Sequence, residues 1–489
     1  MMMVLADVVE ALSGARPEIF APIAIQHIAI DSRTARADSL FVALKGEQHD
    51  GHTFIRDAFD RGAVAALAES RAKAQGLGPR VHFVEMDSDP PTSVAGLQPS
   101  PALALPIVLI VRDSLAALQK FAAYWRRKFP NAKTIGVTGS VGKSSTKELI
   151  AAVLRRRYVI LKTAGNLNNE IGLPLSILQM NATHTRAVLE MGTYARGEIR
   201  ALCEIAQPEI GVVTNVGPSH LERLGSLEKI AEAKSELIHA LPRAGVAILN
   251  ADDARVSAMR AKSRARVFSF GLDPRADLWA DEIEGLGLDG IAFQLHYRAE
   301  KFPVRVPLLG RHSVHTALAA ASVGVVEELG WDEIVRGLQD QSAQLRLIAV
   351  PGENNTTILD DSYNASPASS LAALNLLADL TGRKIAVMGD MLELGNWEED
   401  AHQIVGGRAA QVAQILLAVG ARGKKIGEAA RAAGLAREQV FFAATNANAI
   451  EILRDVIHAG DFILVKGSRG AHMELIVNAL ARAREQERH

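Results

Sequence analysis

The sequence has little cysteine, almost no net charge and no long uncharged apolar run, and each absence excludes a class of protein. Cys203 is the single cysteine among 489 residues, which excludes an internal disulfide framework and a cysteine-rich zinc module. Lys and Arg number 54 and Asp and Glu number 55, so a net charge of −1 draws the chain toward neither nucleic acid nor membranes. No run of about eighteen uncharged apolar residues is present, which argues against a membrane span. We expect a cytoplasmic monomer that neither binds nucleic acid nor inserts into membranes.

Further absences concern the N-terminal segment and repeats. Residues 1–15 include Asp7 and Glu10 and lack a basic segment followed by an apolar core, so we expect an ordinary helix rather than a signal peptide. No repeat of a solenoid period occurs, and low complexity is confined to the proline-rich residues 87–106. The length predicts roughly three units. We place them at residues 1–106, 107–344 and 345–489.

The most informative segment of the sequence is residues 134–148. An apolar run is followed there by a glycine turn, and a Lys-Ser pair begins a predicted helix. Gly139 and Gly142 allow the backbone to bend so that amide N–H groups face an anion. Lys143 would then contact the terminal phosphates of a nucleotide and Ser144 a magnesium ion. The usual first glycine of this motif is replaced by Val137, so we expect a variant loop. A strand, loop and helix that carry Gly-Lys-Ser by chance are the alternative. The predicted nucleotide-binding loop, which the resemblance described below assigns to ATP, comprises Thr138, Gly139, Ser140, Val141, Gly142, Lys143, Ser144 and Ser145.

Apolar runs of strand length alternate with helical patterns on both sides of a less regular region. This alternation predicts an α/β fold with mostly parallel, doubly wound sheets, in which ligands bind at the carboxyl ends of strands. Gly139, Glu190 and Asn215 all follow such strands. Probable β-hairpins occupy residues 291–309, and a second alternating series follows Arg346. The expected strands are residues 187–190, 210–214, 246–249 and 267–270 in the first series, and 357–359, 384–388, 415–419, 440–443 and 462–465 in the second.

Three residues of the first series could carry chemistry, and each has a plainer interpretation. Glu190 could be a magnesium ligand or a carboxylate that caps the next turn. His220 could bind a metal or a phosphate, although a lone histidine in a loop is more often solvated. Lys234 lies in a helical run between glutamates, where spacing alone favours a surface lysine.

Two polar loops of the second series offer further candidates. Residues 360–367, with the sequence DDSYNASP, could hold a ribose hydroxyl through a carboxylate, or could simply form a tight turn. Lys466 and Arg469 follow the last strand and could bind a carboxylate or phosphate. Near the N-terminus, the polar residues 31–33 and 49–52 show no function from their pattern alone.

These motifs together resemble the Mur ligase family of peptidoglycan synthesis, from about residue 31 to residue 474. The resemblance implies three domains, which bind in turn a UDP-linked substrate, ATP with Mg²⁺, and an incoming amino acid or dipeptide. The later motifs are similar to those of members that join D-alanyl-D-alanine to UDP-N-acetylmuramoyl-tripeptide. The motifs are DSR at 31–33, FVAL at 41–44, TGSVGKSS at 138–145, GNLNNEIG at 165–172, EMG at 190–192, NVGPSH at 215–220, AEAK at 231–234, LGR at 309–311, DDSYNASP at 360–367, GDMLELG at 389–395 and VKGSR at 465–469.

The resemblance also implies roles for individual residues. Lys143 is expected at the triphosphate, and Lys234 is expected as a carbamate that becomes an anionic metal ligand. The expected metal ligands are Ser144, Glu190, His220 and the Lys234 carbamate, and the expected catalytic residues are Lys143, Glu190, His220 and Lys234. Further expected contacts are Ser32 and Arg33 with UDP, Asn166 and Asn169 in the substrate cleft, Asn215, Arg346 and Asp361 with ATP, Tyr363 and Asn364 with the dipeptide, and Lys466 and Arg469 with substrate.

One motif departs from the family pattern. Ser313 and Thr316 replace two asparagines, the second of which usually meets adenine, so the resemblance does not extend to recognition of the base. Several alternatives remain open from the residues alone. These are a sister ligase that adds a single amino acid, a folate polyglutamate synthetase, a P-loop kinase or nucleotide switch, and a non-catalytic UDP-sugar-binding scaffold.

Overall fold

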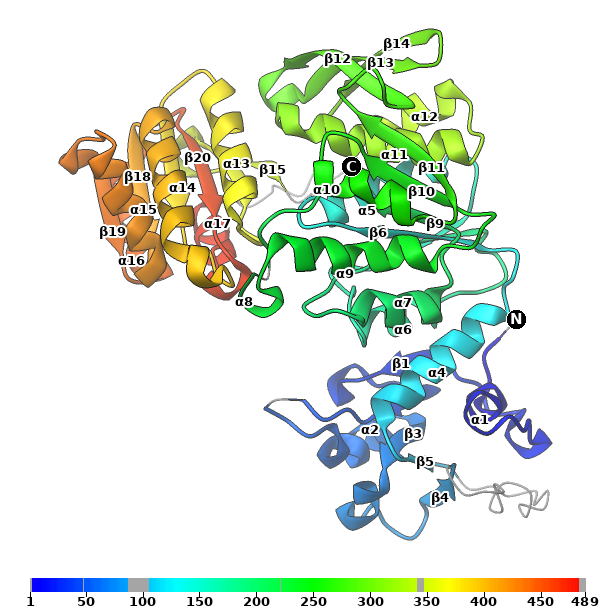
Figure 1. The fold of residues 1–489 in the computed structure, drawn as a ribbon. Helices are drawn as coiled ribbons and strands as arrows, with labels where there is room; N and C mark the ends of the chain where they lie inside the picture. The colour runs from blue at the N-terminus through cyan, green and yellow to red at the C-terminus, as the bar shows by residue number, and fades with distance from the viewer. Residues whose placement is uncertain (1, 47, 87–104, 220, 341–346, 483–489) are drawn as a thin grey trace, which may run out of the picture. The chain divides into compact units, whose positions relative to one another are not determined.

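A computed structural model describes residues 2–46, 48–86, 105–219, 221–340 and 347–482, and its contacts divide the chain into two compact units (Figure 1). The first unit comprises residues 1–134, 158–191 and 200–208, and the second comprises residues 135–157, 192–199 and 209–489. The expected proline-rich segment lies outside the described residues except at its end. Within the described residues, no helix is both long and apolar enough to cross a membrane.

The first unit is built on a parallel five-stranded sheet in the order β1-β2-β3-β5-β4. Small side chains such as Ala66 and Ala68 and larger ones such as Phe41 and Ile55 are buried together in its core. Helix α1 confirms the expected N-terminal helix. The unit contains α1 (Leu5–Ser13), β1 (His27–Ala29), β2 (Ser39–Val42), α2 (Ile55–Asp60), β3 (Ala63–Glu69), β4 (His82–Glu85), β5 (Ile107–Val111), α4 (Ser114–Arg127), β7 (Ile160–Lys162), α6 (Gly172–Ile177), β8 (Arg186–Glu190) and most of α7 (Glu198–Ala206).

The middle part of the second unit carries parallel strands that continue into an antiparallel extension. Strands β6, β9, β10, β11 and β12 pair in parallel, and β12, β13 and β14 then pair in antiparallel fashion. The predicted hairpin is therefore confirmed, with β12 as an additional strand. The elements are β6 (Lys133–Thr138), α5 (Lys143–Leu154), β9 (Ile210–Val213), α8 (Leu221–Leu224), α9 (Leu227–Ala240), β10 (Val246–Asn250), α10 (Ala254–Ser257), β11 (Arg266–Gly271), β12 (Leu278–Gly285), β13 (Ile291–Tyr297), β14 (Glu300–Val306), α11 (Val314–Val326) and α12 (Trp331–Leu338).

The C-terminal part of the second unit is a six-stranded sheet in the order β15-β16-β20-β17-β18-β19, parallel except for β15. Successive side chains of a strand point to opposite faces, so Leu464 packs with helices α13 to α15 while Ile463 and Val465 pack with α16 and α17. Helices thus cover both faces, as predicted for a doubly wound sheet (Figure 1). The elements are β15 (Ile348–Pro351), β16 (Thr357–Asp361), α13 (Pro367–Asp379), β17 (Lys384–Met388), α14 (Glu398–Val412), β18 (Ile415–Val419), α15 (Gly420–Ala432), β19 (Val440–Ala443), α16 (Asn446–Val456), β20 (Phe462–Lys466) and α17 (Glu474–Leu480).

Short 3₁₀ turns connect these elements and place several candidate residues. One of them, η2, carries Ser32 and Arg33, and η7 leads directly into α11. The turns are η1 (Glu18–Phe20), η2 (Ser32–Thr34), η3 (Gly51–Phe54), η4 (Ser70–Gln75), η5 (Ala258–Lys262), η6 (Gly287–Asp289), η7 (Arg311–Ser313), η8 (Glu353–Asn355), η9 (Gly395–Trp397), η10 (Arg437–Gln439) and η11 (Arg469–Ala471).

Candidate functional site

The loop between β6 and α5 requires glycine at two positions. Gly139 has φ of 154°, and a Cβ there would lie 1.8 Å from Thr214 Oγ1, so a larger residue requires the Thr214 side chain to move. Gly142 precedes α5 in the left-handed region with φ of 82°, which side chains with a Cβ disfavour. The loop therefore has the compact shape that exposes backbone amides at a helix N-terminus.

The end of β9 holds this loop in place through hydrogen bonds. Asn215 Oδ1 accepts from Val141 N at 2.9 Å, and its Nδ2 donates to Val141 O at 2.9 Å. Thr214 Oγ1 donates to the same carbonyl at 2.8 Å. Ser140 Oγ donates to Gly217 O at 2.8 Å. Asn215 thus has a loop-positioning role that the sequence did not reveal, and its predicted contact with ATP stays a prediction.

Lys143 and Ser144 begin α5, as predicted. The Lys143 ammonium lies over the loop, where Nζ donates to Gly139 O at 2.8 Å and to Ser140 O at 3.3 Å. Ser144 is buried, and Ser145 is half-buried beside it. A helix N-terminus carries a partial positive charge, so the ammonium and the helix together make this loop a site for an anion.

Lys234 is buried in α9, with only 3% of its surface exposed. Burial, and then the positive charge of Lys143, lowers its pKa well below the usual range. Removal from water disfavours an ammonium, and a second cation disfavours it further. The expectation of a plain surface lysine is therefore wrong, and the two lysines of the site lie within electrostatic reach of each other.

Glu190 belongs to the first unit, where it ends β8 with none of its surface exposed. Asn168 Nδ2 donates to Glu190 Oε1 at 2.7 Å, and Glu190 N donates to Thr163 Oγ1 at 3.0 Å. Asn168 was not singled out from the sequence, although it lies within the GNLNNEIG motif. Of the two predicted neighbours, Asn166 is exposed, while Asn169 Oδ1 accepts from Gly172 N at 2.9 Å and caps α6.

The predicted UDP-contacting residues of the first unit lie in η2. Ser32 is buried, and its hydrogen bond is the main cause of a lowered pKa at Asp57. Arg33 is exposed and forms an ion pair with Asp31, in which Nη2 lies 2.6 Å from Oδ2. That pairing lowers the pKa of Asp31 to about 2. Arg33 is thus accessible to a ligand, and its role stays a prediction.

Two loops of the C-terminal part are joined by a buried ion pair. Asp361 and Lys466 are direct partners in the parallel pairing of β16 with β20, and Lys466 Nζ donates to the Asp361 carboxylate. Lys466 also donates to Asn364 O at 3.0 Å, and its side chain is only 1% exposed. On the neighbouring loop, Arg469 Nη1 donates to the Tyr363 hydroxyl at 2.8 Å. These predicted residues therefore come together, with Lys466 fixing the loop that carries Asp361 and Asn364.

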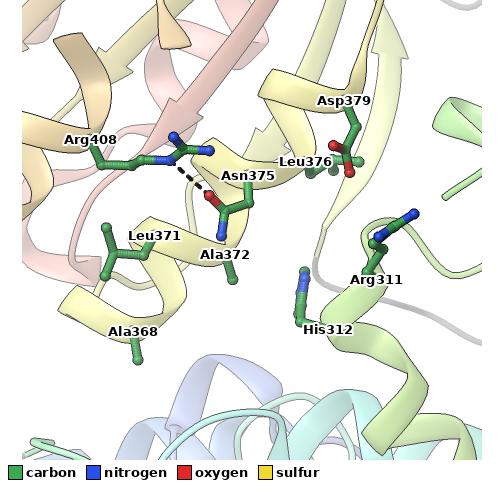
Figure 2. Close-up of a pocket in the computed structure, with 9 residues that line it drawn as sticks. All are labelled: Arg311, His312, Ala368, Leu371, Ala372, Asn375, Leu376, Asp379 and Arg408. Atoms are coloured by element: carbon green, nitrogen blue, oxygen red, sulfur yellow. Dashed lines mark hydrogen bonds between the residues drawn. The ribbon is translucent and has the colours of Figure 1, made fainter. Parts of the chain in front are cut away.

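A pocket of about 510 Å³ lies between η7 and α13 (Figure 2). Leu371 and Leu376 of α13 line it with apolar side chains, and His312 of η7 points into it (Figure 2). Arg408 Nε donates to Asn375 Oδ1 at 2.8 Å, which leaves the amide nitrogen of Asn375 as a donor for a ligand. Its lining comprises Arg311, His312, Ala368, Leu371, Ala372, Asn375, Leu376, Asp379 and Arg408.

The pocket is linked to both predicted nucleotide loops through residues of η7 and α11. Burial and the charge of Lys466 lower the pKa of His312 to about 4, so His312 lies within electrostatic reach of the Asp361–Lys466 pair. Ser313 Oγ donates to Leu309 O at 2.7 Å. Thr316 Oγ1 lies 4.0 Å from the position of a Cβ on Gly142. The two residues that depart from the family pattern thus flank the region between the phosphate loop and the pocket.

Two predicted residues, His220 and Arg346, lie outside the described residues. Among the residues that are described, no three His, Cys, Asp or Glu side chains gather in a way that could hold a metal ion. A cation at Ser144 would therefore depend on other oxygen donors, such as a carbamate or a phosphate.

A glycine loop held at the carboxyl end of a parallel strand, with a lysine over it and a helix behind it, defines a P-loop α/β protein built to bind phosphate. The chain belongs to the Mur ligase family. Three family models match it: "Mur ligase family, catalytic domain" over residues 24–126, "Mur ligase middle domain" over residues 137–324, and "Mur ligase, glutamate ligase domain" over residues 345–469.

Individual relatives match nearly the whole chain. The UDP-N-acetylmuramoyl-tripeptide–D-alanyl-D-alanine ligase of Bacillus subtilis is 34% identical over 460 residues, which cover 93% of each chain. A crystal structure of MurF from Acinetobacter baumannii superposes with a TM-score of 0.81 at 30% identity and covers 98% of each chain. MurF ligase from Thermotoga maritima in complex with ADP gives a TM-score of 0.75 at 26% identity, over 93% of this chain and 96% of that one.

Proposed function

We propose that this chain is an ATP-dependent ligase that joins D-alanyl-D-alanine to the terminal carboxylate of UDP-N-acetylmuramoyl-tripeptide. The named activity of the Bacillus subtilis relative, together with identity along nearly the full length, supports this substrate pair. The observation that carries the proposal on this chain is the phosphate loop, over which Lys143 is held by two loop carbonyls beside the buried Lys234. The ADP bound to the Thermotoga maritima relative supports ATP as the phosphate donor.

The reaction has two steps whose charges match the residues of the loop. A carboxylate oxygen of the tripeptide attacks the γ-phosphorus of ATP, the bond to the β-phosphate oxygen breaks, and ADP leaves. The amine of the dipeptide then attacks the acyl carbon, loses a proton, and phosphate leaves with the original carboxylate oxygen. Lys143 and the α5 N-terminus offset the repulsion between carboxylate and triphosphate, and such electrostatic effects dominate phosphoryl transfer.

A magnesium ion fits the donor set at the start of α5. When bound, it neutralises developing charge on the phosphates. Ser144 supplies a hydroxyl, and Lys234 supplies an amine whose pKa is lowered by burial and by the charge of Lys143. An unprotonated amine attacks CO₂ at carbon and releases a proton, which converts Lys234 into an anionic carbamate with two oxygen donors. The metal roles predicted for Glu190 and His220 stay predictions.

The carbamate has a test that does not depend on turnover. After equilibration with ¹³C-bicarbonate, we expect a carbamate carbonyl resonance in the ¹³C spectrum that is absent from Lys234→Met. A matched control is Lys229→Met, which removes an exposed lysine of the same helix and retains the resonance. Identical spectra of the parent chain and Lys234→Met would reject the carbamate.

The pocket between η7 and α13 is proposed to receive the nucleoside end of ATP. The pocket is lined by His312, whose pKa is lowered in part by the charge of Lys466. Lys466 donates a hydrogen bond to Asp361, which is the predicted nucleotide contact. Asn375, with its oxygen fixed by Arg408, presents N–H donors to the ring nitrogens of a base. The pocket thus offers base contacts from Asn375, while Ser313 and Thr316, which replace the usual asparagines, do not line it.

The function is tested by ATP-dependent phosphate release with UDP-N-acetylmuramoyl-tripeptide and a panel of acceptors. We expect release with D-alanyl-D-alanine and little with D-alanine or L-amino acids. Preference for a single amino acid would instead indicate a sister ligase, and preference for a folate substrate a polyglutamate synthetase. Phosphate transfer to a hydroxyl, with no amide formed, would indicate a kinase. Each of these outcomes would overturn the proposed substrate pair.

A further inference from the structure

Two arginines of the second unit are each held against a tyrosine ring. Arg223 Cζ lies 5.1 Å from the ring centroid of Tyr194, and Arg469 Cζ lies 5.3 Å from that of Tyr363. The Tyr363 hydroxyl also accepts from Arg469 Nη1 at 2.8 Å. A guanidinium over a ring keeps most of its N–H donors available at its edge. We call these four residues the two tyrosine–arginine pairs.

The two pairs lie near each other although they come from segments far apart in the sequence. Tyr363 is one of the groups whose charge acts on Tyr194, whose pKa is raised chiefly by burial. Helix α8, which carries Arg223, contacts the segment that contains η9, where Glu222 N donates to Glu393 O at 3.3 Å. On the C-terminal side, Tyr363 follows β16 and Arg469 follows β20, the two neighbouring strands that carry the Asp361–Lys466 pair.

The two arginines of the pairs are accessible to an anionic ligand. Neither Arg223 nor Arg469 forms an ion pair with Asp or Glu in the part of the chain that the structure describes, and both are exposed. Lys466 is already paired with Asp361. The nearby Glu198 carboxylate accepts from the backbone of residues 194 and 195 at 2.7 and 3.2 Å, so it is directed to that turn. Glu393 is the acidic group whose charge acts most strongly on Tyr194.

We propose that Arg223 and Tyr194 complete, with Arg469 and Tyr363, the site that binds the C-terminal carboxylate of the incoming dipeptide. The inference rests on the proposed function and names the residues that select its acceptor. An extended dipeptide spans about 7 Å, so its carboxylate must be held close to the amine that reacts. Tyr363 lies two residues after Asp361, next to the predicted nucleotide contact. Guanidinium groups pair with a carboxylate, and the tyrosine rings offer apolar faces to the two methyl groups of the dipeptide.

The test compares D-alanyl-D-alanine with its C-terminal amide, which lacks the negative charge, in the full chain and in Arg223→Gln. A lost charge-assisted hydrogen bond corresponds to roughly a 10- to 100-fold change. We therefore expect Arg223→Gln to raise KM for the dipeptide by about this factor, with KM for ATP and for the tripeptide substrate unchanged. The amide should be a poor acceptor for the parent chain and no poorer for the variant. Arg223→Lys, which keeps the charge, should fall between the two.

Arg255→Gln is the matched control, because Arg255 is a surface arginine of the same unit that pairs with Glu228. It should leave every KM unchanged. If Arg223→Gln still discriminates between dipeptide and amide as strongly as the parent chain, the carboxylate site is overturned while the proposed function stands. If the parent chain releases no phosphate with the dipeptide, the proposed function fails and the carboxylate site fails with it.

Discussion

Two loops of the second unit both follow parallel strands and both precede helices, yet they are held in different ways. The loop after β6 is held to the end of β9 by neutral hydrogen bonds from Asn215, Thr214 and Ser140, and glycines occupy its two positions of positive φ. The loop after β16 is held by the charged pair of Asp361 and Lys466. The first loop is therefore fixed by shape, whereas the second is fixed by a buried ion pair whose two partners depend on each other.

This difference separates the effects of mutation. In the phosphate loop, removal of the Lys143 ammonium loses its two bonds to Gly139 O and Ser140 O, but the hydrogen bonds of Asn215 with Val141 remain. In the C-terminal loop, the charge that fixes the backbone is itself one of the candidate ligand-binding groups. We therefore expect a substitution of Lys143 in the first loop to lower activity with little loss of stability. A substitution of Lys466 at the second loop should lower both.

The largest effect is expected for Lys143→Ala. It removes the charge that opposes the triphosphate, so kcat/KM for phosphate release should fall by at least about 10³-fold. The unfolding midpoint should stay within a few degrees of the parent, because the loop keeps its contacts with β9. Lys229→Ala, an exposed lysine of α9, should change neither quantity. Parent-like turnover by Lys143→Ala would remove Lys143 from the mechanism.

Lys466→Met should lower stability and activity together. It leaves the Asp361 carboxylate, which is only 15% exposed, without its Lys466 partner, and such a loss costs up to about 3–5 kcal/mol of unfolding free energy. Lys425→Met is the matched control, because Lys425 pairs with Glu398 and Glu399 near the surface, where such pairs contribute roughly 1 kcal/mol or less. Denaturant titration measures both. Equal losses in the two variants would show that the Asp361–Lys466 pair does not hold its loop.

Asn215→Ala should weaken the phosphate loop without removing a charge. The N–H and C=O of Val141 lose a partner, which costs about 1–3 kcal/mol. We expect KM for ATP to rise about tenfold by the same reasoning, with a smaller change in kcat. Asn215→Asp retains an acceptor for Val141 N but places a carboxylate against Val141 O, so it should rescue little. An unchanged KM for ATP in both variants would contradict the positioning role of Asn215.

The smallest effect is a pH dependence at His312, whose pKa is lowered from 6.5 to about 4 by burial and by Lys466. Between these two pH values the unfolded chain holds a proton that the folded chain does not. Stability should therefore fall as the pH falls from about 6.5 to about 4, and His312 should contribute no slope above that window. His312 is exposed and lines a pocket, so solvent screening reduces the effect of Lys466 on its pKa and the stability that depends on it.

Thermal unfolding across this window tests the contribution. His312→Gln should show a shallower loss of stability on the acid side than the parent chain, and His239→Gln, at an exposed position of α9, should match the parent. Lys466→Met should raise the pKa of His312 and shift the same loss to higher pH. If His312→Gln loses stability at acid pH as steeply as the parent chain does, His312 does not cause this pH dependence.

Much of the fold and of the phosphate loop was predictable, because both depend on local patterns. Alternating strand and helix runs give a parallel sheet, and the glycines of residues 139–142 with Lys143 give a phosphate loop wherever they follow a strand. Strand β12 was missed because Asp281, Glu282 and Glu284 interrupt its apolar pattern at a sheet extension that is partly open to solvent.

The remainder depends on strand order, which a single sequence does not show. Asp361 and Lys466 are 105 residues apart and meet because β20 lies between β16 and β17. The burial of Lys234 follows from the packing of α9, whereas the spacing of its neighbouring glutamates favoured the surface. Asn168 lay inside a recognised motif, but its bond to Glu190 depends on the pairing of β7 with β8.

The transfer of oxygen from the tripeptide carboxylate to phosphate tests the account most directly. The tripeptide substrate is labelled with ¹⁸O in its terminal carboxylate and incubated with ATP, Mg²⁺ and D-alanyl-D-alanine, and the released phosphate is analysed by mass spectrometry. Attack of the carboxylate on the γ-phosphorus predicts one ¹⁸O in each phosphate, with ADP as the other product. Unlabelled phosphate, or AMP and pyrophosphate in place of ADP, would contradict it.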